Sequence, residues 1–273
     1  MPFPSLLSRT LLVLCIIAFS CNSAKKSQSG HVLATSADTP HSFEFEYKQH
    51  GNDWASNPEG VGCAVFEDST DSHYFESPID ISYSTSSPEK PLEIHYSPFA
   101  EIVDDNGHTI QVNTPDSNAY IIYQGQRFNL LQFHFHAHSE NRINGHISPM
   151  ELHLVHKNTA TGRLTVIGVM LEEGGDGPAF DRIWSYIPGK PETTVRTDVF
   201  FDPSTMLPAT SHFFAFKGSL TTPACTGNLN WIVMKDPVHI SSKQIEAFKK
   251  HYPDNFRNLQ PLHGRTITEY VWH

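Results

Sequence analysis

The sequence lacks the positive charge that proteins bound to nucleic acid usually carry. Its 273 residues contain 19 lysines and arginines against 29 aspartates and glutamates, which gives a net charge of −10, and no run of Lys or Arg exceeds two. Binding to a phosphate backbone depends on clustered Lys and Arg side chains. We therefore expect no nucleic-acid partner.

The sequence also has no convincing membrane-spanning run near its N-terminus. The run LLVLCIIAF at 11–19 contains nine apolar residues and follows Arg9 and Thr10. It is too short to cross a bilayer but suits the hydrophobic region of a signal peptide. We predict that residues 1–20 are a signal peptide and that the protein is exported to the periplasm or the cell surface.

The end of that run, IIAFSCN, resembles a bacterial lipoprotein signal, because the small Ser20 directly precedes Cys21. This predicts that Cys21 is lipidated and attaches the protein to a membrane. An ordinary secretory signal, cut between Ser20 and Ser29, is the alternative.

Cysteine is rare, with four in the chain. If Cys15 leaves with the signal peptide and Cys21 carries lipid, Cys63 and Cys225 remain as one pair. An exported chain with one cysteine pair predicts a disulfide, although two separate buried thiols are the alternative. Closing so long a loop would stabilise the fold by up to about 5 kcal/mol in the chain-entropy model.

The chain shows no internal repeat and no linker that would divide it. Residues 21–40 are polar and aperiodic and are predicted to be a tether, whereas 41–273 form one domain. Short runs rich in Val, Ile, Phe and Tyr predict strands. They lie at 109–113, 119–123, 128–136, 150–157, 163–171, 212–216 and 230–234.

Helix signals are fewer than strand signals. In the segment 241–250, Ser241 and Gln244 have the spacing of a capping box and basic residues follow in the last turn. A second helix is predicted within 178–187. The fold class is therefore mostly β, with short peripheral helices.

The segment HFHAHSEN at 134–141 suggests a metal site. Side chains two apart on a strand share a face, so His134, His136, His138 and Glu140 would face one way if the strand continues. Leu131, Phe133, Phe135 and Ala137 would face the other way, into a core. Packing alone does not explain the row of imidazoles.

The next predicted strand, MELHLVHK, adds Glu151 and His153 on one face. Turn signals in NRINGHISP allow the chain to return and bring a third imidazole beside the first two. Three imidazoles with an open fourth position describe a catalytic zinc site. Gln132 and Glu151 each precede a histidine by two positions, so each is placed to accept a ring N–H and orient that ring.

Spacing leaves two questions open. The pair on the first strand is either His134 with His136 or His136 with His138. In addition, His134, His136 and Glu140 fit the H-x-H-x-x-x-E pattern of cupin-like metal oxygenases, in which the carboxylate is itself a ligand.

The chain resembles the α-class carbonic anhydrases, including exported bacterial members, from about Tyr47 to about Ile267. The resemblance depends on the order and spacing of several motifs. They are SPIDI (77–81), NGHTIQV (106–112), LLQFHFHAHSEN (130–141), MELHLVHKN (150–158), LTVIGVMLEEG (164–174), GSLTTPAC (218–225), NWIVMKDP (230–237) and NFRNLQPLHGR (255–265).

The resemblance implies a large, mainly antiparallel twisted sheet and a zinc site made by His134, His136 and His153, with His138 outside it. It also implies that Thr221 accepts a hydrogen bond from the attacking hydroxide and donates its own to Glu140. The implied reaction is the reversible hydration of carbon dioxide to bicarbonate and a proton.

Further roles follow from the same resemblance. His108 matches the position of the proton shuttle, and an imidazole titrates near neutral pH. Cys63 and Cys225 match a disulfide of exported members. The residues implied to line the substrate pocket are Val155, Val166, Leu220 and Trp231 on an apolar side and Gln111 and Thr222 on a polar side.

The sequence departs from the family at a few positions. Glu76 replaces the usual Gln before SPIDI, and Phe216 replaces a common Tyr. These changes leave the predicted ligands in place. A relative that binds zinc without catalysis is the remaining alternative, and intact ligands together with Thr221, Glu140 and His108 argue against it.

Overall fold

The computed structural model describes residues 45–56, 63, 75–114, 118–187, 194–210 and 212–271. The predicted signal peptide, Cys21 and the polar tether lie outside these residues. Within them, no helix is long and apolar enough to span a membrane.

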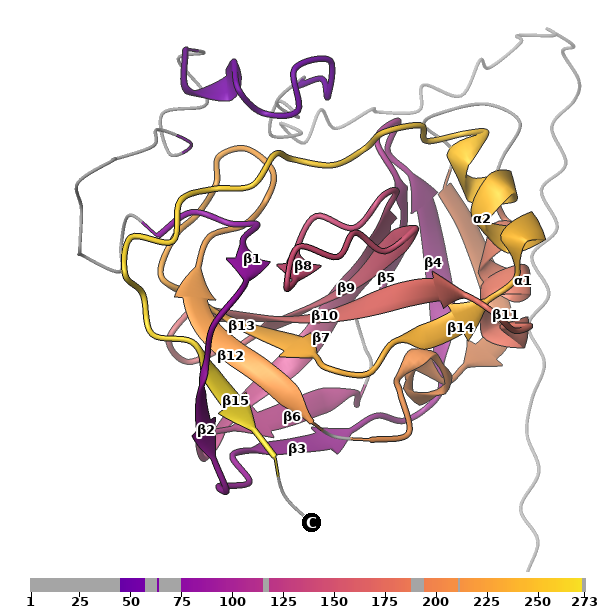
Figure 1. Ribbon diagram of the computed structural model, residues 1–273. Helices are drawn as coiled ribbons and strands as arrows, with labels where there is room; N and C mark the ends of the chain where they lie inside the picture. Colours follow the sequence, from indigo (N-terminus) through magenta and orange to yellow (C-terminus); the bar gives the residue numbers. More distant parts are fainter. Residues whose placement is uncertain are drawn as a thin grey trace, which may run out of the picture. The chain divides into compact units, whose positions relative to one another are not determined.

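The described residues form a 13-stranded sheet, in the order β11-β4-β5-β7-β9-β10-β13-β12-β15-β2, with β14 pairing with β10 and β6 joining β3 to β7 (Figure 1). A separate pair joins β1 and β8. The strands are β1 (Asp80–Ile81), β2 (Thr85–Ser87), β3 (Leu92–His95), β4 (Phe99–Asp105), β5 (Ile110–Asn113), β6 (Tyr120–Tyr123), β7 (Gln126–His136), β8 (Arg142–Ile143), β9 (Met150–Lys157), β10 (Leu164–Glu173), β11 (Thr194–Phe201), β12 (Phe213–Gly218), β13 (Leu229–Met234), β14 (Val238–Ile240) and β15 (Thr268–Tyr270).

The seven strand predictions are confirmed, at β5, β6, β7, β9, β10, β12 and β13. The sheet is mixed, which refines the expectation of a mainly antiparallel one. Its parallel pairs are β10 with β13, β10 with β14 and β15 with β2, whereas the neighbours of β7 are antiparallel. The mostly β class is confirmed.

Two α-helices, α1 (Pro178–Trp184) and α2 (Ser242–Lys249), lie together at one side of the sheet (Figure 1). The capping box predicted for the second is present, because the Ser241 hydroxyl accepts from the backbone N–H of Gln244 and the Gln244 side chain bonds back to Ser241. The indole of Trp184 donates to the carbonyl of Gln244, which ties the helices together. Short 3₁₀ turns occur at Trp54–Ser56 and Pro203–Met206.

The central strands bury both of their faces. Phe133, Phe135 and Leu152 belong to a large apolar core on one face. A smaller cluster that includes Val155, Val166 and Trp231 lies on the other face. The histidines of β7 that are two apart, His134 and His136, fall on the second face, so the fold surrounds them with buried side chains.

One local feature differs from simple alternation. Leu130 pairs with His156 and Gln132 pairs with Val155, so Leu131 is an extra residue in β7. Before this bulge the even-numbered residues of β7 face the large core, and after it the odd-numbered residues do. Both Leu130 and Phe133 can therefore lie in that core. Leu131, expected on the core face, is instead 41% exposed.

Candidate metal centre

Three imidazoles from β7 and β9 meet on one face of the sheet. His134 lies directly opposite His153 in the antiparallel register, and His136 is two residues further along β7. One nitrogen from each of the three rings lies within 4.8 Å of the others. This spacing allows a single ion to contact three ring nitrogens.

Each ring has its other nitrogen near an oxygen atom. His134 Nδ1 is 2.8 Å from Gln132 Oε1, and His153 Nε2 is 3.0 Å from Glu151 Oε1. His136 Nδ1 is 2.7 Å from the backbone carbonyl oxygen of Asn255. An oxygen that accepts a ring N–H fixes the tautomer, so the lone pairs of His134 Nε2, His136 Nε2 and His153 Nδ1 are left for a metal.

Burial favours the neutral form of two of these imidazoles, those of His134 and His136. It lowers the pKa of His134 well below its ordinary value, and it lowers the pKa of His136 to about 4. A metal ion binds the neutral ring, so His134 and His136 need not lose a proton at neutral pH before binding. The Nε2 atoms of these two rings, together with Nδ1 of His153, therefore fit a dipositive ion such as zinc.

Glu151 is a buried carboxylate behind His153. Its Oε2 accepts hydrogen bonds of 2.8 Å from the backbone N–H groups of both Glu140 and Asn141. Burial raises the pKa of Glu151, but His153 and the hydrogen bonds outweigh burial and hold that pKa below its ordinary value. The group is therefore an ionised acceptor for His153.

Glu140 reaches the site from the loop after β7, because the strand ends at His136. Its Oε1 accepts from the backbone N–H of Arg257 at 2.7 Å, and its Oε2 lies 3.4 Å from His136 Nε2. Burial raises the pKa of Glu140 to about 7, while His153 and a hydrogen bond with the Thr221 side chain lower it. Glu140 and Thr221 are thus brought together beside the three imidazoles.

His138 lies apart from the three-histidine cluster. Its ring stacks on Phe256 with centroids 3.8 Å apart, and Nδ1 donates to the carbonyl of Ser139 at 2.6 Å. Because β7 has already ended, the alternation that would have placed His138 beside His136 does not apply.

A cavity of about 110 Å³ opens beside the imidazoles. Its walls include Gln111, Thr222 and His108, together with His134 and His136. The ring of His108 stacks on Phe45 with centroids 4.2 Å apart. A half-buried imidazole thus stands at the edge of the same cavity as two of the three clustered histidines.

An apolar surface forms the other side of the centre. Val155 pairs with Val166 across β9 and β10, and Val166 pairs with Trp231 on β13. Leu220 packs against this cluster. The Trp231 ring lies against His153, with centroids 4.9 Å apart. The four residues expected to line an apolar pocket therefore meet beside one of the imidazoles.

Comparison with known proteins identifies the family. Residues 66–271 match the family described as eukaryotic-type carbonic anhydrase. The chain belongs to this family.

Relatives cover most of the chain. A carbonic anhydrase from Nostoc is 40% identical over 202 residues, covering 72% of this chain and 76% of the relative. A carbonic anhydrase from Neisseria gonorrhoeae is 34% identical over 271 residues, covering 98% of this chain and 99% of the relative.

A solved structure supports the same assignment. The α-carbonic anhydrase from Thermovibrio ammonificans, in complex with the inhibitor sulfanilamide, aligns with a TM-score of 0.76 at 34% identity. The alignment covers 82% of the present chain and 98% of the Thermovibrio chain. The family, the fold class and the enzyme class that the sequence resemblance implied are confirmed.

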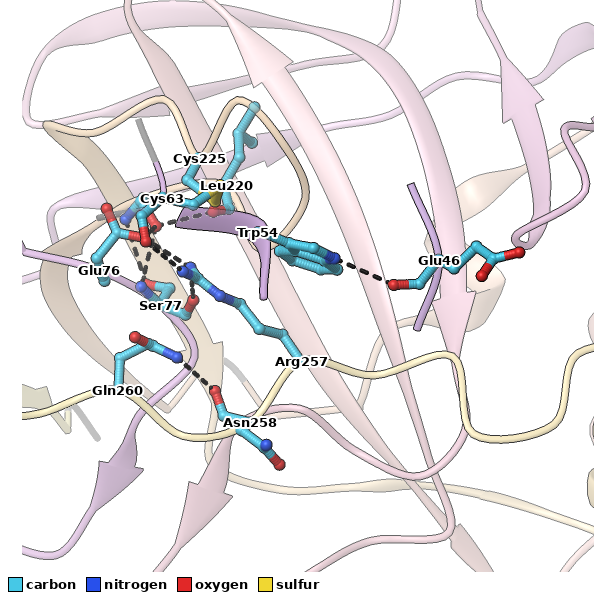
Figure 2. Close-up of a disulfide and its surroundings, with 11 residues drawn as sticks. Glu46, Trp54, Cys63, Glu76, Ser77, Leu220, Cys225, Arg257, Asn258 and Gln260 are labelled. Carbon is cyan, nitrogen blue, oxygen red and sulfur yellow. Dashed lines mark hydrogen bonds and ion pairs between the residues drawn. A yellow bond between two sulfur atoms is a disulfide. The ribbon is translucent and has the colours of Figure 1, made fainter. Parts of the chain in front are cut away.

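The predicted disulfide between Cys63 and Cys225 is present in this carbonic anhydrase fold, and 162 positions separate the two residues. It lies close to a buried ion pair in which Arg257 Nη1 is 2.7 Å from Glu76 Oε2 (Figure 2). Cys225 N–H donates to the carbonyl of Thr222. The disulfide is thus attached to the turn that follows Thr221.

Sequence reasoning gave no role to Asn255 or Arg257, although both fall in the quoted motif NFRNLQPLHGR. Asn255 contacts His136 through a backbone carbonyl, and Arg257 contacts Glu140 through a backbone N–H. Side-chain identity does not reveal such contacts. The departure at Glu76 is accounted for by the Arg257 guanidinium, which pairs with the new carboxylate.

Proposed function

We propose that the protein catalyses the reversible hydration of carbon dioxide to bicarbonate with a zinc ion held by His134 Nε2, His136 Nε2 and His153 Nδ1. The observation that carries the proposal is the set of three clustered nitrogens, on rings whose other nitrogen lies within 3.0 Å of an oxygen atom. Three imidazoles with an open position suit catalytic zinc. When bound, zinc lowers the pKa of a water molecule to about 7, for which carbonic anhydrases are themselves the standard example, and so supplies a nucleophile.

Glu140 and Thr221 orient the nucleophile in this proposal. The Thr221 hydroxyl donates to the carboxylate of Glu140, so its oxygen is left to accept a hydrogen bond from the attacking group. Arg257 N–H donates to Oε1 of this carboxylate at 2.7 Å. The loop carboxylate is therefore fixed in place, and it aligns a lone pair of the nucleophile with the substrate.

Carbon dioxide has no net charge or dipole, so an apolar surface suits it. Val155, Val166, Leu220 and Trp231 provide that surface beside His153. Gln111 and Thr222 lie in the cavity next to His134 and His136, where they provide the polar side. We assign bicarbonate release to this polar side.

His108 carries the proton away in the last step. It borders the cavity that contains His134 and His136, and its ring is only half-buried. An imidazole with one side toward the cavity and one toward solvent relays protons through water to buffer.

We propose further that the protein is exported to the periplasm or the cell surface and anchored by lipid on Cys21. The Cys63–Cys225 disulfide supports export, because such bonds persist in oxidising compartments. Mass spectrometry of the mature N-terminus tests this part. Diacylated Cys21 is the expected result, and an unmodified N-terminus beyond residue 21 contradicts it.

One experiment tests the catalytic proposal. The protein from residue 22 onward is purified, its metal content is measured, and carbon dioxide hydration is followed with and without a sulfonamide. We expect one zinc per chain and hydration that the sulfonamide inhibits. Zinc without hydration would indicate a binding protein, whereas iron or manganese would indicate cupin-like chemistry.

Thr221→Ala is the sharper variant. It should slow hydration while leaving zinc content unchanged, because Thr221 orients the nucleophile without binding the metal. Thr226→Ala, in the same loop, is the matched control and should hydrate at the normal rate.

A further inference from the structure

Lys217 lies on the face of the sheet opposite the metal centre. It belongs to β12, where Phe213 and Ala215 at alternate positions face the large core, whereas Phe214 and Phe216 join the cluster beside Trp231. Lys217 pairs with Asn230 of β13 in the sheet register. The lysine therefore plays no part in the proposed hydration site.

The Lys217 amine has a neutral partner. Its Nζ is 2.6 Å from Asn230 Oδ1, and no carboxylate of the described residues lies within 4.0 Å of it. Asn230 Nδ2 donates to Thr165 Oγ1 at 3.0 Å, which fixes the amide with its oxygen toward the lysine. The amine is thus held without a counter-ion.

The surroundings of Lys217 make its charged ammonium form less favourable than that of a fully exposed lysine. Burial lowers the pKa of Lys217, and the positive charge of Arg163 lowers it further. An uncharged amine is a nucleophile, whereas an ammonium group is not.

A small cavity lies beside this amine. It has a volume of about 170 Å³, and its walls include Lys217, Asn230, Thr266 and Thr268. Carbon dioxide is small enough to enter. Two of the residues in its walls, Thr266 and Thr268, are threonines, whose hydroxyl groups are able to donate to an anion.

We propose that Lys217 is a carbamylation site, where the amine adds to carbon dioxide and forms a carbamate. The nitrogen lone pair forms a new N–C bond to the carbon of carbon dioxide, and one C–O π bond opens to give the carboxylate. The nitrogen then loses one proton to solvent, so no oxidant or further reactant is required. The remaining N–H keeps its bond to Asn230 Oδ1, and the new negative charge gains from the nearby Arg163.

Carbon dioxide labelled with carbon-13 tests the proposal. The protein is equilibrated with labelled bicarbonate and carbon dioxide, the carbamate signal is recorded by NMR, and the adduct is trapped by alkylation and located by mass spectrometry. We expect label on Lys217 and none on Lys243, an exposed lysine at the start of α2. Label that is absent from Lys217, or equal on both lysines, would overturn the proposal.

Two variants separate the reaction from folding. Lys217→Arg should lose the labelled site, whereas the control Lys243→Arg should keep it. Asn230→Asp retains the lysine but adds a carboxylate beside it, which raises the amine pKa and so lowers carbamate occupancy about tenfold or more at neutral pH. Unchanged occupancy in Asn230→Asp would contradict the role of the neutral partner.

The proposal goes beyond the hydration reaction and does not depend on it. Zinc-stripped protein should therefore still carry the label on Lys217. Failure of the hydration test would leave this result unchanged, and failure of labelling would leave hydration unchanged.

Discussion

Strand β9 carries two buried histidines three positions apart, which consequently lie on opposite faces of the sheet. His153 stands in the three-histidine cluster with a buried carboxylate, Glu151, behind it. His156 instead has neutral partners, the hydroxyl of Tyr96 at 2.7 Å from Nε2 and the carbonyl of Thr165 at 3.3 Å from Nδ1. Both nitrogens of His156 are therefore used within the protein.

The difference shows what distinguishes a proposed zinc ligand from a structural histidine in this fold. His153 has one nitrogen 3.0 Å from Glu151 and the other in the cluster of three imidazoles, whereas both nitrogens of His156 have partners within the protein. Burial alone does not separate them, since both side chains are almost fully buried. Replacing His153 should therefore affect zinc affinity, whereas replacing His156 should affect the pH dependence of stability.

The largest effect is expected from His153→Ala. Loss of one of three ligands should lower zinc affinity by more than the roughly 10- to 100-fold typical of losing a residue that only supports a ligand. Zinc titration with a competing chelator measures the change. His156→Gln is the matched variant on the same strand and should keep normal zinc affinity. Equal losses in both variants would contradict the distinction between the two faces.

Glu151→Gln should have the next largest effect. The amide retains one acceptor for His153 but brings an N–H toward the backbone donors of Glu140 and Asn141. We expect zinc affinity to fall about 10- to 100-fold. The same titration checks this, with the exposed Glu246→Gln as control. An unchanged affinity would show that the charge of Glu151 does not support His153.

Lowering the pH should destabilise the folded protein, because His156 is buried in its neutral form. Burial lowers its pKa to about 3 from the ordinary 6.5. Below pH 6.5 His156 binds a proton in the unfolded chain but stays unprotonated in the folded protein. The contribution of His156 to stability is therefore fully present above pH 6.5 and is lost as the pH falls toward 3. The free energy of unfolding should drop by about 2 kcal/mol between pH 7 and pH 5 from this residue.

Urea unfolding at the two pH values measures this loss. His156→Gln does not titrate at this position, so its stability should fall less between pH 7 and pH 5 than that of the unaltered protein. An identical fall in both proteins would show that His156 is not the group responsible.

The smallest effect is expected at His108, the half-buried histidine. His108→Ala should slow turnover several-fold in weak buffer only, because proton removal then limits the rate, and added imidazole should restore it. Stopped-flow hydration in weak and strong buffer measures both effects. Normal turnover in weak buffer would remove the shuttle assignment.

Much of the site's scaffold was accessible from sequence because its strands are long and regular. Alternation predicted that His134 and His136 share a face of β7, and turn signals before β9 allowed His153 to return beside them. The capping box predicted the start of α2. Strand β4 was missed, since the buried positions of FAEIVDD include Glu101 and Asp105, which hide the apolar alternation. The shorter strands carry too few residues to show a period.

Other features needed three-dimensional structure. Spacing could not decide between His134 and His138, because the answer depends on where β7 ends; the family resemblance implied His134, and the end of the strand at His136 gives the physical reason. The bulge at Leu131 depends on pairing with β9, and the support of His136 by Asn255 involves a backbone carbonyl 119 positions away. Such features arise from tertiary contacts rather than from local pattern.

The most direct test of the central claim is the rate of carbon dioxide hydration measured by stopped flow on protein of known zinc content. Three samples are compared: unaltered protein, His153→Ala and His156→Gln. Hydration should accompany one zinc per chain in the unaltered protein and in His156→Gln, and it should be lost together with zinc in His153→Ala. Hydration that persists in zinc-free His153→Ala would contradict the claim.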